Sequence, residues 1–265
     1  MIDIRPMDEG YILPRCLHDG PIDATAERAP EPVEPDLPPH PWSDDVISAV
    51  AAKHRGWITH GGDPPSREFM REMIQRHGTC ALLAWEGTMV VGFMRFYAMG
   101  IARLVAEHRS KAPEGVLDCT LACAPEEDEG TLWVQCVMTS RPYTGWSEPA
   151  LPSGKPHSWS ATAREAGARK GLGLGLARAM ISWARERGWK RLIKVAHCDL
   201  DFFYGQWGGG GKRFWEKAGF KAIGTVHQPE QWSNPDDLRV LQAQAAQKGM
   251  TEEEVWTLHR MGYEL

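Results

Sequence analysis

A glycine-rich turn that runs directly into an amphipathic helix restricts the fold of this chain more than any other feature. The turn at 169–175 reads Arg-Lys-Gly-Leu-Gly-Leu-Gly. The apolar residues of the helix recur at helical spacing: Leu172, Leu176, Met180 and Trp183. Gly188 is placed to end the helix, and the apolar run at 191–196 predicts a strand directly after it.

The chemistry of this turn suits a pyrophosphate. Small residues at Gly171, Gly173 and Gly175 let the backbone approach a ligand closely, and the first turn of the helix points unpaired N–H groups and its positive dipole end the same way. Arg169 and Lys170 add positive charge beside that place. The glycines could also serve only to pack the helix closely on a sheet. A glycine pattern by itself does not decide between the two.

Before the turn, the sequence predicts two helices and three strands. Apolar stripes indicate helices at 43–56 and 66–78, each closed by glycine. Two apolar runs at 81–85 and 89–97, joined by Glu-Gly, predict a hairpin, and 131–139 predicts a further strand.

Shorter elements are expected elsewhere. Residues 100–130 combine a helix-like stretch at 101–109 with a polar acidic loop and are left unassigned. After the glycine turn we expect a helix at 214–218 and a strand at 220–226. The chain is expected to end in two helices, from about Asp236 and from Thr251, where Thr-Glu-Glu-Glu fits a capping box.

Composition divides the chain into three parts. Residues 1–42 are rich in proline and acid and should form an extended arm. Residues 43–228 form the main domain, with a Pro-, Gly- and Ser-rich insertion at about 140–166 that should be a long surface excursion. Residues 229–265 are expected to be a helical extension.

The net charge of −5 and the charged fraction of 25% describe a mildly acidic globule without the basic bias that nucleic-acid binding requires. The first residues lack the pattern of a signal peptide, and no apolar run is long enough to cross a bilayer. We therefore expect a cytoplasmic protein with neither a nucleic-acid nor a membrane partner.

The cysteines argue against a disulfide framework. Six are scattered along the chain, most of them inside apolar runs, where free cysteine behaves as a small buried hydrophobe. Cys119 and Cys123 are close enough for a metal or redox site but have no second pair and no histidine cluster beside them. Core packing is the favoured interpretation, and no metal is expected.

In the order and spacing of its elements, this sequence resembles the GNAT acyltransferases. The turn and helix of that family look like 169–173 followed by Trp-Ala-Arg-Glu-Arg-Gly at 183–188. The segment 214–225, Phe-Trp-Glu-Lys-Ala-Gly-Phe-Lys-Ala-Ile-Gly-Thr, looks like the family's closing helix and strand. The resemblance also covers 80–97 and 131–139, but not the first forty residues, the insertion or the tail.

This resemblance implies an α/β fold with a mixed, largely antiparallel sheet flanked by helices. Coenzyme A would enter where two central parallel strands splay apart, and acetyl-CoA would be the co-substrate. The expected binding residues are Arg169, Lys170, Gly171, Leu172, Gly173, Leu174 and Gly175 for the pyrophosphate. The expected pantetheine contacts are Val137, Met138 and Thr139, and Trp215 would also lie at the cofactor. Dimers are common in the family, which makes a homodimer one expectation.

One departure from the family concerns the proton that returns to the thiolate. Many members have a tyrosine four residues before the glycine of the closing Gly-Phe, whereas this chain has Trp215, whose indole is not a useful acid. Tyr204 is the nearest tyrosine and a candidate acid, although a packed aromatic is the favoured interpretation from sequence. His197 and Asp199 could take or relay the proton of the amine, or be an ordinary surface histidine and turn aspartate.

The predicted function is acetyl transfer from acetyl-CoA to a primary amine, either a small molecule or a peptide, by direct attack. A non-catalytic acyl-CoA-binding or protein-interaction module is the first alternative, and Trp215 favours it. A dinucleotide oxidoreductase would need a strand leading into the glycines and an acidic residue at the end of the next strand. The sequence shows neither, since that next strand ends in Ala196-His197.

Overall fold

The computed structural model describes residues 1–17, 20–27, 43, 61–62, 64–110, 129–140, 171–200, 202–203, 210–227 and 235–265. The Cys119–Cys123 pair lies outside these residues, as do residues 18–19 and 28–42 of the arm. All but the first residue of the predicted helix at 43–56, and all but the first residue of the insertion, also lie outside them. The domain boundaries suggested at 42 and 228 also lie outside them.

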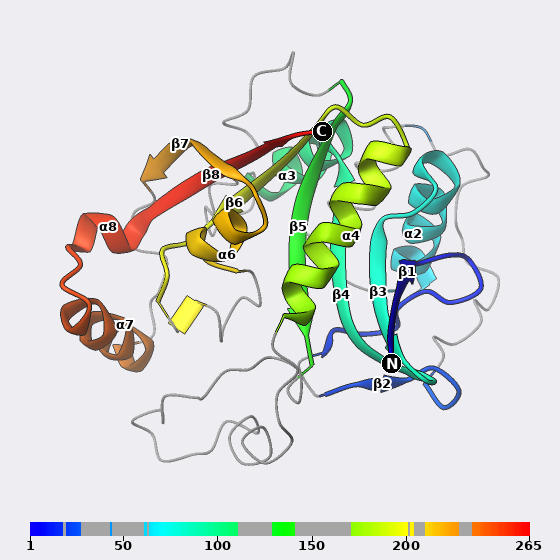
Figure 1. Cartoon of the computed structure of the whole chain (residues 1–265), viewed down its shortest axis with the longest axis horizontal. Helices are drawn as coiled ribbons and strands as arrows, with labels where there is room; N and C mark the ends of the chain where they lie inside the picture. Colours follow the sequence, from blue (N-terminus) through cyan, green and yellow to red (C-terminus); the bar gives the residue numbers. More distant parts are fainter. Residues whose placement is uncertain are drawn as a thin grey trace.

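One mixed sheet of eight strands organises the described residues (Figure 1). Its order is β1-β3-β4-β5-β6-β8-β7, and β2 pairs with β4 beside this path. Among the described strands, β5 and β6 are the one parallel pair, and all other neighbours are antiparallel. The strands are β1 Ile2–Pro6, β2 Ile22–Asp23, β3 Ala81–Glu86, β4 Met89–Ala98, β5 Thr131–Thr139, β6 Arg191–Ala196, β7 Lys221–His227 and β8 Thr257–Glu264.

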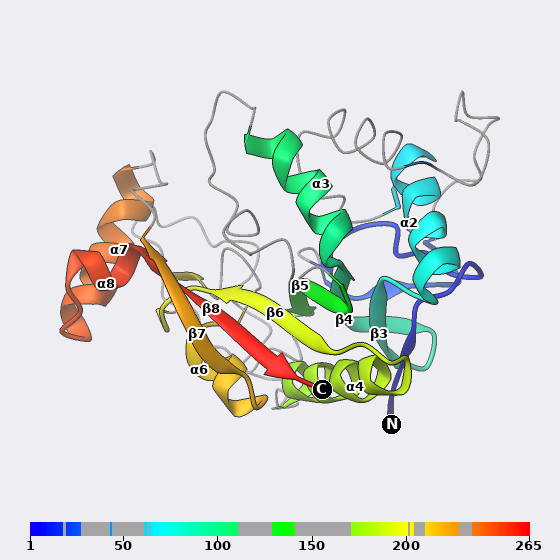
Figure 2. The same ribbon diagram turned by 90° about the horizontal axis from the view of Figure 1, so that it is seen from above.

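Helices cover both faces of the sheet, as Figure 2 shows with α4 on one face and α2 and α3 on the other. The described helices are α2 Pro64–His77, α3 Met99–Ser110, α4 Leu172–Glu186, α6 Lys212–Lys217, α7 Pro235–Gln247 and α8 Glu252–Trp256. In the described part of the chain, none of these helices has the length and apolar character that a membrane span needs. The predicted α/β class, a largely antiparallel sheet flanked by helices, is therefore confirmed.

Each face of the sheet carries its own apolar core. On one face, α4 buries Leu176 and Met180 against β4 and β5, in a cluster that also contains Trp215 of α6. On the other face, Phe69 and Met73 of α2 pack against Phe93 and other residues of β3 and β4. The hydrophobic periodicity of the two helices places these side chains inward, and burial of each large side chain contributes about 1.5–3 kcal/mol.

Most predicted elements are confirmed. The helix at 66–78 is α2, the hairpin is β3 and β4, and the strands at 131–139 and 191–196 are β5 and β6. The first six residues differ from the expected arm, because β1 pairs antiparallel with β3 from Ile2 opposite Glu86 to Pro6 opposite Leu82.

The last residues differ as well. The predicted capping box is present, with Thr251 and Glu254 bonding each other's backbone N–H, but α8 ends at Trp256. The chain then continues as β8, which lies between β6 and β7 and pairs with both. Hydrogen bonds to two neighbouring strands stabilise this strand, although its sequence shows no regular alternation that would predict it.

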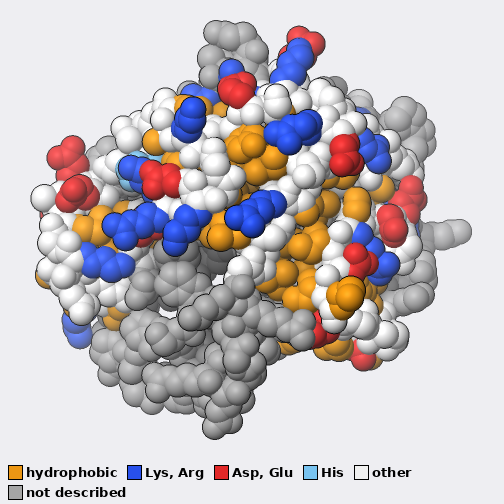
Figure 3. Space-filling model, viewed as in Figure 1, with side chains coloured by type: hydrophobic (Ala, Val, Ile, Leu, Met, Phe, Trp, Pro, Cys, Tyr) orange, Lys and Arg blue, Asp and Glu red, His pale blue; other side chains and the backbone are white. Residues whose placement is uncertain are grey.

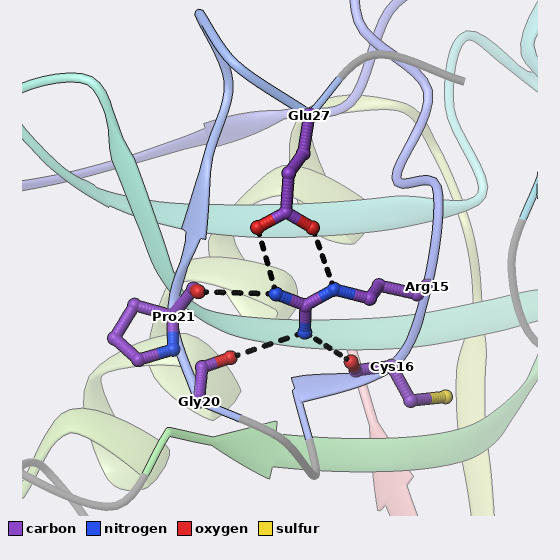
Figure 4. A network of polar contacts seen from close by, with 5 residues as sticks. All are labelled: Arg15, Cys16, Gly20, Pro21 and Glu27. Atoms are coloured by element: carbon purple, nitrogen blue, oxygen red, sulfur yellow. Dashed lines mark hydrogen bonds and ion pairs between the residues drawn. The ribbon is translucent and has the colours of Figure 1, made fainter. Parts of the chain in front are cut away.

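Hydrogen bonds from Arg15 hold together the N-terminal segment from Arg15 to Glu27 (Figure 4). Arg15 donates from Nε and Nη2 to the two carboxylate oxygens of Glu27, at 2.7 and 2.9 Å. The same guanidinium donates to the carbonyl oxygens of Cys16, Gly20 and Pro21 at 3.2, 3.5 and 3.3 Å. A bidentate pair with additional carbonyl acceptors is stronger than an ordinary surface ion pair.

We expect Glu27→Gln to lower the free energy of unfolding by about 1 kcal/mol, because it removes a charged bidentate partner from a guanidinium bonded on every side. Chemical denaturation measures the change. The matched control is Glu129→Gln, since Glu129 is 92% exposed and 3.7 Å from Lys190 Nζ. The control should change the free energy by less than about 0.5 kcal/mol. Equal effects of the two substitutions would contradict the prediction.

Candidate functional site

An opening in the middle of the sheet, between the parallel strands β5 and β6, is the centre of the candidate site. The two strands pair only at their beginnings, where 131–133 lie opposite 191–193. A bulge follows, since Arg95 and Phe96 of β4 face Cys136 and Val134, which leaves Gln135 as the extra residue of β5. A bulge bends its strand and increases the local twist. Beyond it, β5 continues along β4 to Thr139 without pairing with β6.

A lysine reaches across this opening. Lys194 of β6 is 8% exposed, and its Nζ donates to the backbone oxygen of Gln135 at 2.6 Å. This bond satisfies a carbonyl that would otherwise pair with the neighbouring strand. The opening is therefore polar on the β5 side, with a buried cation beside it.

The start of α4 lies over the end of β5. A Cβ added to Gly92 would lie 3.3 Å from Leu172 Cδ2 and 3.2 Å from Leu176 Cδ1. Gly92 is paired with Thr139, the last residue of β5. The missing side chain at Gly92 thus lets the first turn of α4 approach the sheet beside the end of β5, as seen in Figure 1.

The predicted pantetheine contacts come from this end of β5. Val137 belongs to the core on the α4 face, whereas Met138 belongs to the core on the α2 face. Thr139 is half-buried. These three residues alternate between the faces, as residues of a strand must, so the backbone of the segment lies at the opening while the side chains diverge.

The N-terminus of α4 has the geometry of an anion site. Gly171 precedes the helix with φ of +106°, a conformation that favours glycine, and no side chain among the described residues caps the helix. A Cβ added to Gly171 would have no atom of the described residues within 4 Å, apart from its chain neighbours and the helix's own backbone. Leu172, Gly173 and Leu174 occupy the first turn, whose N–H groups have no acceptor inside the helix. Together with the helix dipole, they favour a negatively charged group there.

The helix α6 stands beside this turn. A Cβ on Gly173 would lie 3.1 Å from Phe214 Cε2, whereas one on Gly175 would lie 3.5 Å from Ile4 Cδ1, an ordinary contact. A side chain at Gly173 would therefore require Phe214 of α6 to shift by a few tenths of an ångström. Figure 3 shows Lys and Arg side chains gathered over and beside α6, which carries the exposed residues Arg213 and Lys217. Such a patch favours binding of a polyphosphate.

The segment after β6 is tied to the start of α6. His197 accepts from the backbone N–H of Lys212 at 3.0 Å through its carbonyl oxygen. The two carboxylate oxygens of Asp199 both lie 3.1 Å from the backbone nitrogen of Arg213. These contacts bring two candidate proton carriers to the same end of the sheet as the opening and the start of α4.

The imidazole of His197 is stacked on Phe203, with ring centroids 4.5 Å apart. Burial, with a smaller effect of the nearby Lys194, lowers the pKa of His197 to about 3. The ring is therefore neutral at physiological pH, able to exchange hydrogen bonds but weak as a base toward an ammonium group.

Trp215 lies inside the core. It is fully buried, its ring contacts Phe214 and Phe220 edge-on at 5.0 Å, and its indole nitrogen donates to the Gly210 oxygen at 2.9 Å. The indole N–H is thus already engaged, and the residue anchors α6 to the sheet.

Three predicted site residues, Arg169, Lys170 and Tyr204, lie outside the described residues. Three residues at the opening were not among the predicted site residues: Gln135, Lys194 and Arg95. A charged residue inside an apolar strand was the available signal for the last two, since Lys194 and Arg95 interrupt otherwise hydrophobic runs. Across the described ranges, no group of three or more His, Cys, Asp or Glu side chains is placed to hold a metal ion.

Comparison with known proteins gives structural likeness alone. No family model matches the chain, and no curated protein sequence matches it. Among solved structures, a polyamine N-acetyltransferase from Drosophila melanogaster shares 12% identity, with all of both chains covered and a TM-score of 0.45. A GNAT-family acetyltransferase from Streptococcus pneumoniae shares 11% identity over all of both chains, with a TM-score of 0.43.

A putative acetyltransferase from Salmonella typhimurium, solved with acetyl-CoA, shares 12% identity at a TM-score of 0.44, covering 100% of this chain and 94% of its own. These three solved structures are all acetyltransferases. TM-scores below 0.5 mark these likenesses as loose, and none of them assigns an activity to this chain.

The depressed pKa of His197 predicts a pH dependence of stability. In the unfolded chain, a histidine takes up its proton below about pH 6.5, whereas His197 in the folded chain does so only near pH 3. A falling pH in this window therefore favours unfolding, by up to ~1.4 kcal/mol per pH unit for this proton.

In His197→Gln, this contribution to the change of unfolding free energy with pH should disappear. Denaturation curves recorded between about pH 7 and pH 5 measure the change for both proteins. Other histidines with lowered pKa values, His77 and His259, remain in both proteins, so the difference between the slopes isolates His197. Identical slopes would contradict the prediction.

Proposed function

We propose that this chain is a GNAT-type N-acetyltransferase that moves the acetyl group of acetyl-CoA to a primary amine. The observation that carries the proposal is the opening between β5 and β6, with the uncapped N-terminus of α4 placed over the end of β5. An anion site beside a split parallel pair suits a ligand with a diphosphate at one end and an extended amide chain at the other. A cytoplasmic location and a homodimer stay predictions.

The residues present fit such a ligand. The N–H groups of the first turn of α4 would hold the pyrophosphate, with Gly171 leaving room for it and Arg169 and Lys170 adding charge. The backbone of Val137, Met138 and Thr139 would line the pantetheine. When bound, acetyl-CoA supplies a thioester, whose carbonyl carbon is open to attack by an amine.

The chain's own part in the reaction is mainly one of positioning. The neutral amine forms the new N–C bond, the C–S bond breaks, and one proton of the amine ends on the departing thiol. Asp199 and His197 are the candidates to relay that proton, and Tyr204 is the candidate to deliver it. Holding amine and thioester together can provide much of the rate without a dedicated acid.

A non-catalytic acyl-CoA-binding module is the second candidate. Trp215 favours it, because the residue at the position of the family's tyrosine is a core residue whose N–H is already bonded. The two candidates share the coenzyme site and differ in turnover. Formation of free thiol from acetyl-CoA in the presence of an amine separates them.

Leu174→Glu should weaken acetyl-CoA binding at least about tenfold, measured by isothermal titration. Leu174 is half-buried in the first turn of α4, where a glutamate is favourable for the helix itself. Its carboxylate would repel a diphosphate and compete for the same N–H groups. The matched control is Leu174→Gln, which loses the same packing without adding charge and should bind within about threefold of the natural chain.

Two results would contradict the proposed site. Well-folded natural protein that binds neither acetyl-CoA nor free coenzyme A would remove the central claim. Equal binding by the Glu and Gln variants would place the diphosphate somewhere other than the start of α4.

A further inference from the structure

Arg95 of β4 is a buried cation, and two of its three guanidinium nitrogens have no hydrogen-bond partner among the described residues. The residue is 1% exposed, and its guanidinium carbon lies 4.8 Å from the centre of the Phe93 ring. Its Nη1 donates to Gln135 Oε1 at 3.4 Å, a long hydrogen bond. Its Nε and Nη2 are buried and have no hydrogen-bond partner in the part of the chain that the structure describes. Buried polar groups are normally paired, so this edge requires an explanation.

Three titratable side chains among the described residues are influenced by the charge of Arg95, and they are Cys80, Tyr97 and Cys136. Burial raises the pKa of Cys80 to about 12 and raises the pKa values of Tyr97 and Cys136 as well, against a smaller lowering by Arg95 itself. All three side chains are therefore neutral at physiological pH, and the guanidinium stays uncompensated by them.

Arg15 shows which kind of group the Nε and Nη2 donors of an arginine bind in this chain. In Arg15, Nε and Nη2 hold the two oxygens of the Glu27 carboxylate at 2.7 and 2.9 Å (Figure 4). These two nitrogens present parallel N–H groups whose spacing matches a carboxylate. Arg95 presents the equivalent pair of donors without such a partner.

The position of Arg95 relates it to the candidate site. Arg95 lies opposite Cys136, directly after the bulge, and Gln135 connects it to Lys194 through its side chain and its backbone oxygen. Its neighbours on β4, Phe93 and Tyr97, belong to the core on the α2 face. Arg95 therefore lies beside the opening between β5 and β6, on the face of the sheet opposite α4.

We propose that the Nε and Nη2 edge of Arg95 binds a carboxylate of the acceptor, so that the acceptor is an amine that also carries a carboxylate, such as an amino acid. This inference rests on the proposed acetyl transfer. An acceptor held on the α2 face would meet, at the opening, a thioester whose diphosphate is held on the α4 face. The new N–C bond and the departing thiol are those of the proposed reaction, and Arg95 only positions the acceptor.

The test measures binding of carboxylate probes separately from binding of acetyl-CoA. A panel of N-acetyl amino acids with small, apolar and acidic side chains, each with its amide, is titrated into the full chain. We expect at least one acid to bind about tenfold or more tightly than its amide, as a bidentate charged pair would provide. In Arg95→Gln this preference should disappear, while the affinity for acetyl-CoA should change less than about threefold.

Two further variants show whether the preference depends on the guanidinium of Arg95 itself. Arg95→Lys retains the charge without the fork and should keep only part of the preference. Arg178→Gln removes an exposed arginine of α4 and should leave the preference unchanged. If neither Arg95 variant folds, the thermal shift of the natural chain with each acid and its amide decides, and a shift specific to the acid supports the site.

The inference is overturned if no acid in the panel binds more tightly than its amide, or if a folded Arg95→Gln keeps the preference. Its failure is distinct from that of the proposed function. Loss of the carboxylate preference with intact acetyl-CoA binding removes only the inference. Absence of acetyl-CoA binding with an intact preference removes only the proposed function and leaves a carboxylate site.

Discussion

The short pairing between β5 and β6 is the constraint on which the rest of the site depends. Parallel strands that share hydrogen bonds along their whole length leave no room between them. Here the pairing stops after 131–133, and the bulge at Gln135 turns β5 away. Backbone groups in the middle of a sheet are thereby freed, which is costly unless another partner satisfies them. Lys194 satisfies one of them, the oxygen of Gln135.

Small residues let the helices approach this opening. Gly92 gives the first turn of α4 access to the end of β5, and Gly173 gives α6 access to that same turn. The positive φ of Gly171 lets the chain enter the helix at the required angle. Trp215 then holds α6 in place by filling the core between helix and sheet.

Two arginines of the N-terminal half, Arg15 and Arg95, show how much the surroundings decide the role of a charge. Arg15 is bonded by a carboxylate and three carbonyl oxygens and fastens a surface segment. Arg95 lies among an aromatic ring, neutral thiols and a phenol, where a desolvated cation is unfavourable without a counter-charge. A desolvated cation of this kind next to an opening is well suited to select an anionic ligand.

The sequence by itself determined the elements whose signals are local. Apolar periodicity defined α2 and α4, the Glu-Gly turn defined the hairpin, and the capping box at Thr251 defined the start of α8. The glycine turn likewise indicated the start of α4, where we propose that an anion binds. These signals lie within a few residues of what they describe, so no knowledge of distant partners was needed.

Only the tertiary structure decided the features that depend on distant partners. β1 and β8 are strands because β3, β6 and β7 offer them hydrogen bonds, and nothing in their own residues requires it. The bulge at Gln135 exists relative to β4, and the pKa of His197 depends on what buries it. Arg95, Gln135 and Lys194 lie on three different strands, so their meeting at one opening follows from sheet order, which residue types and spacing do not encode.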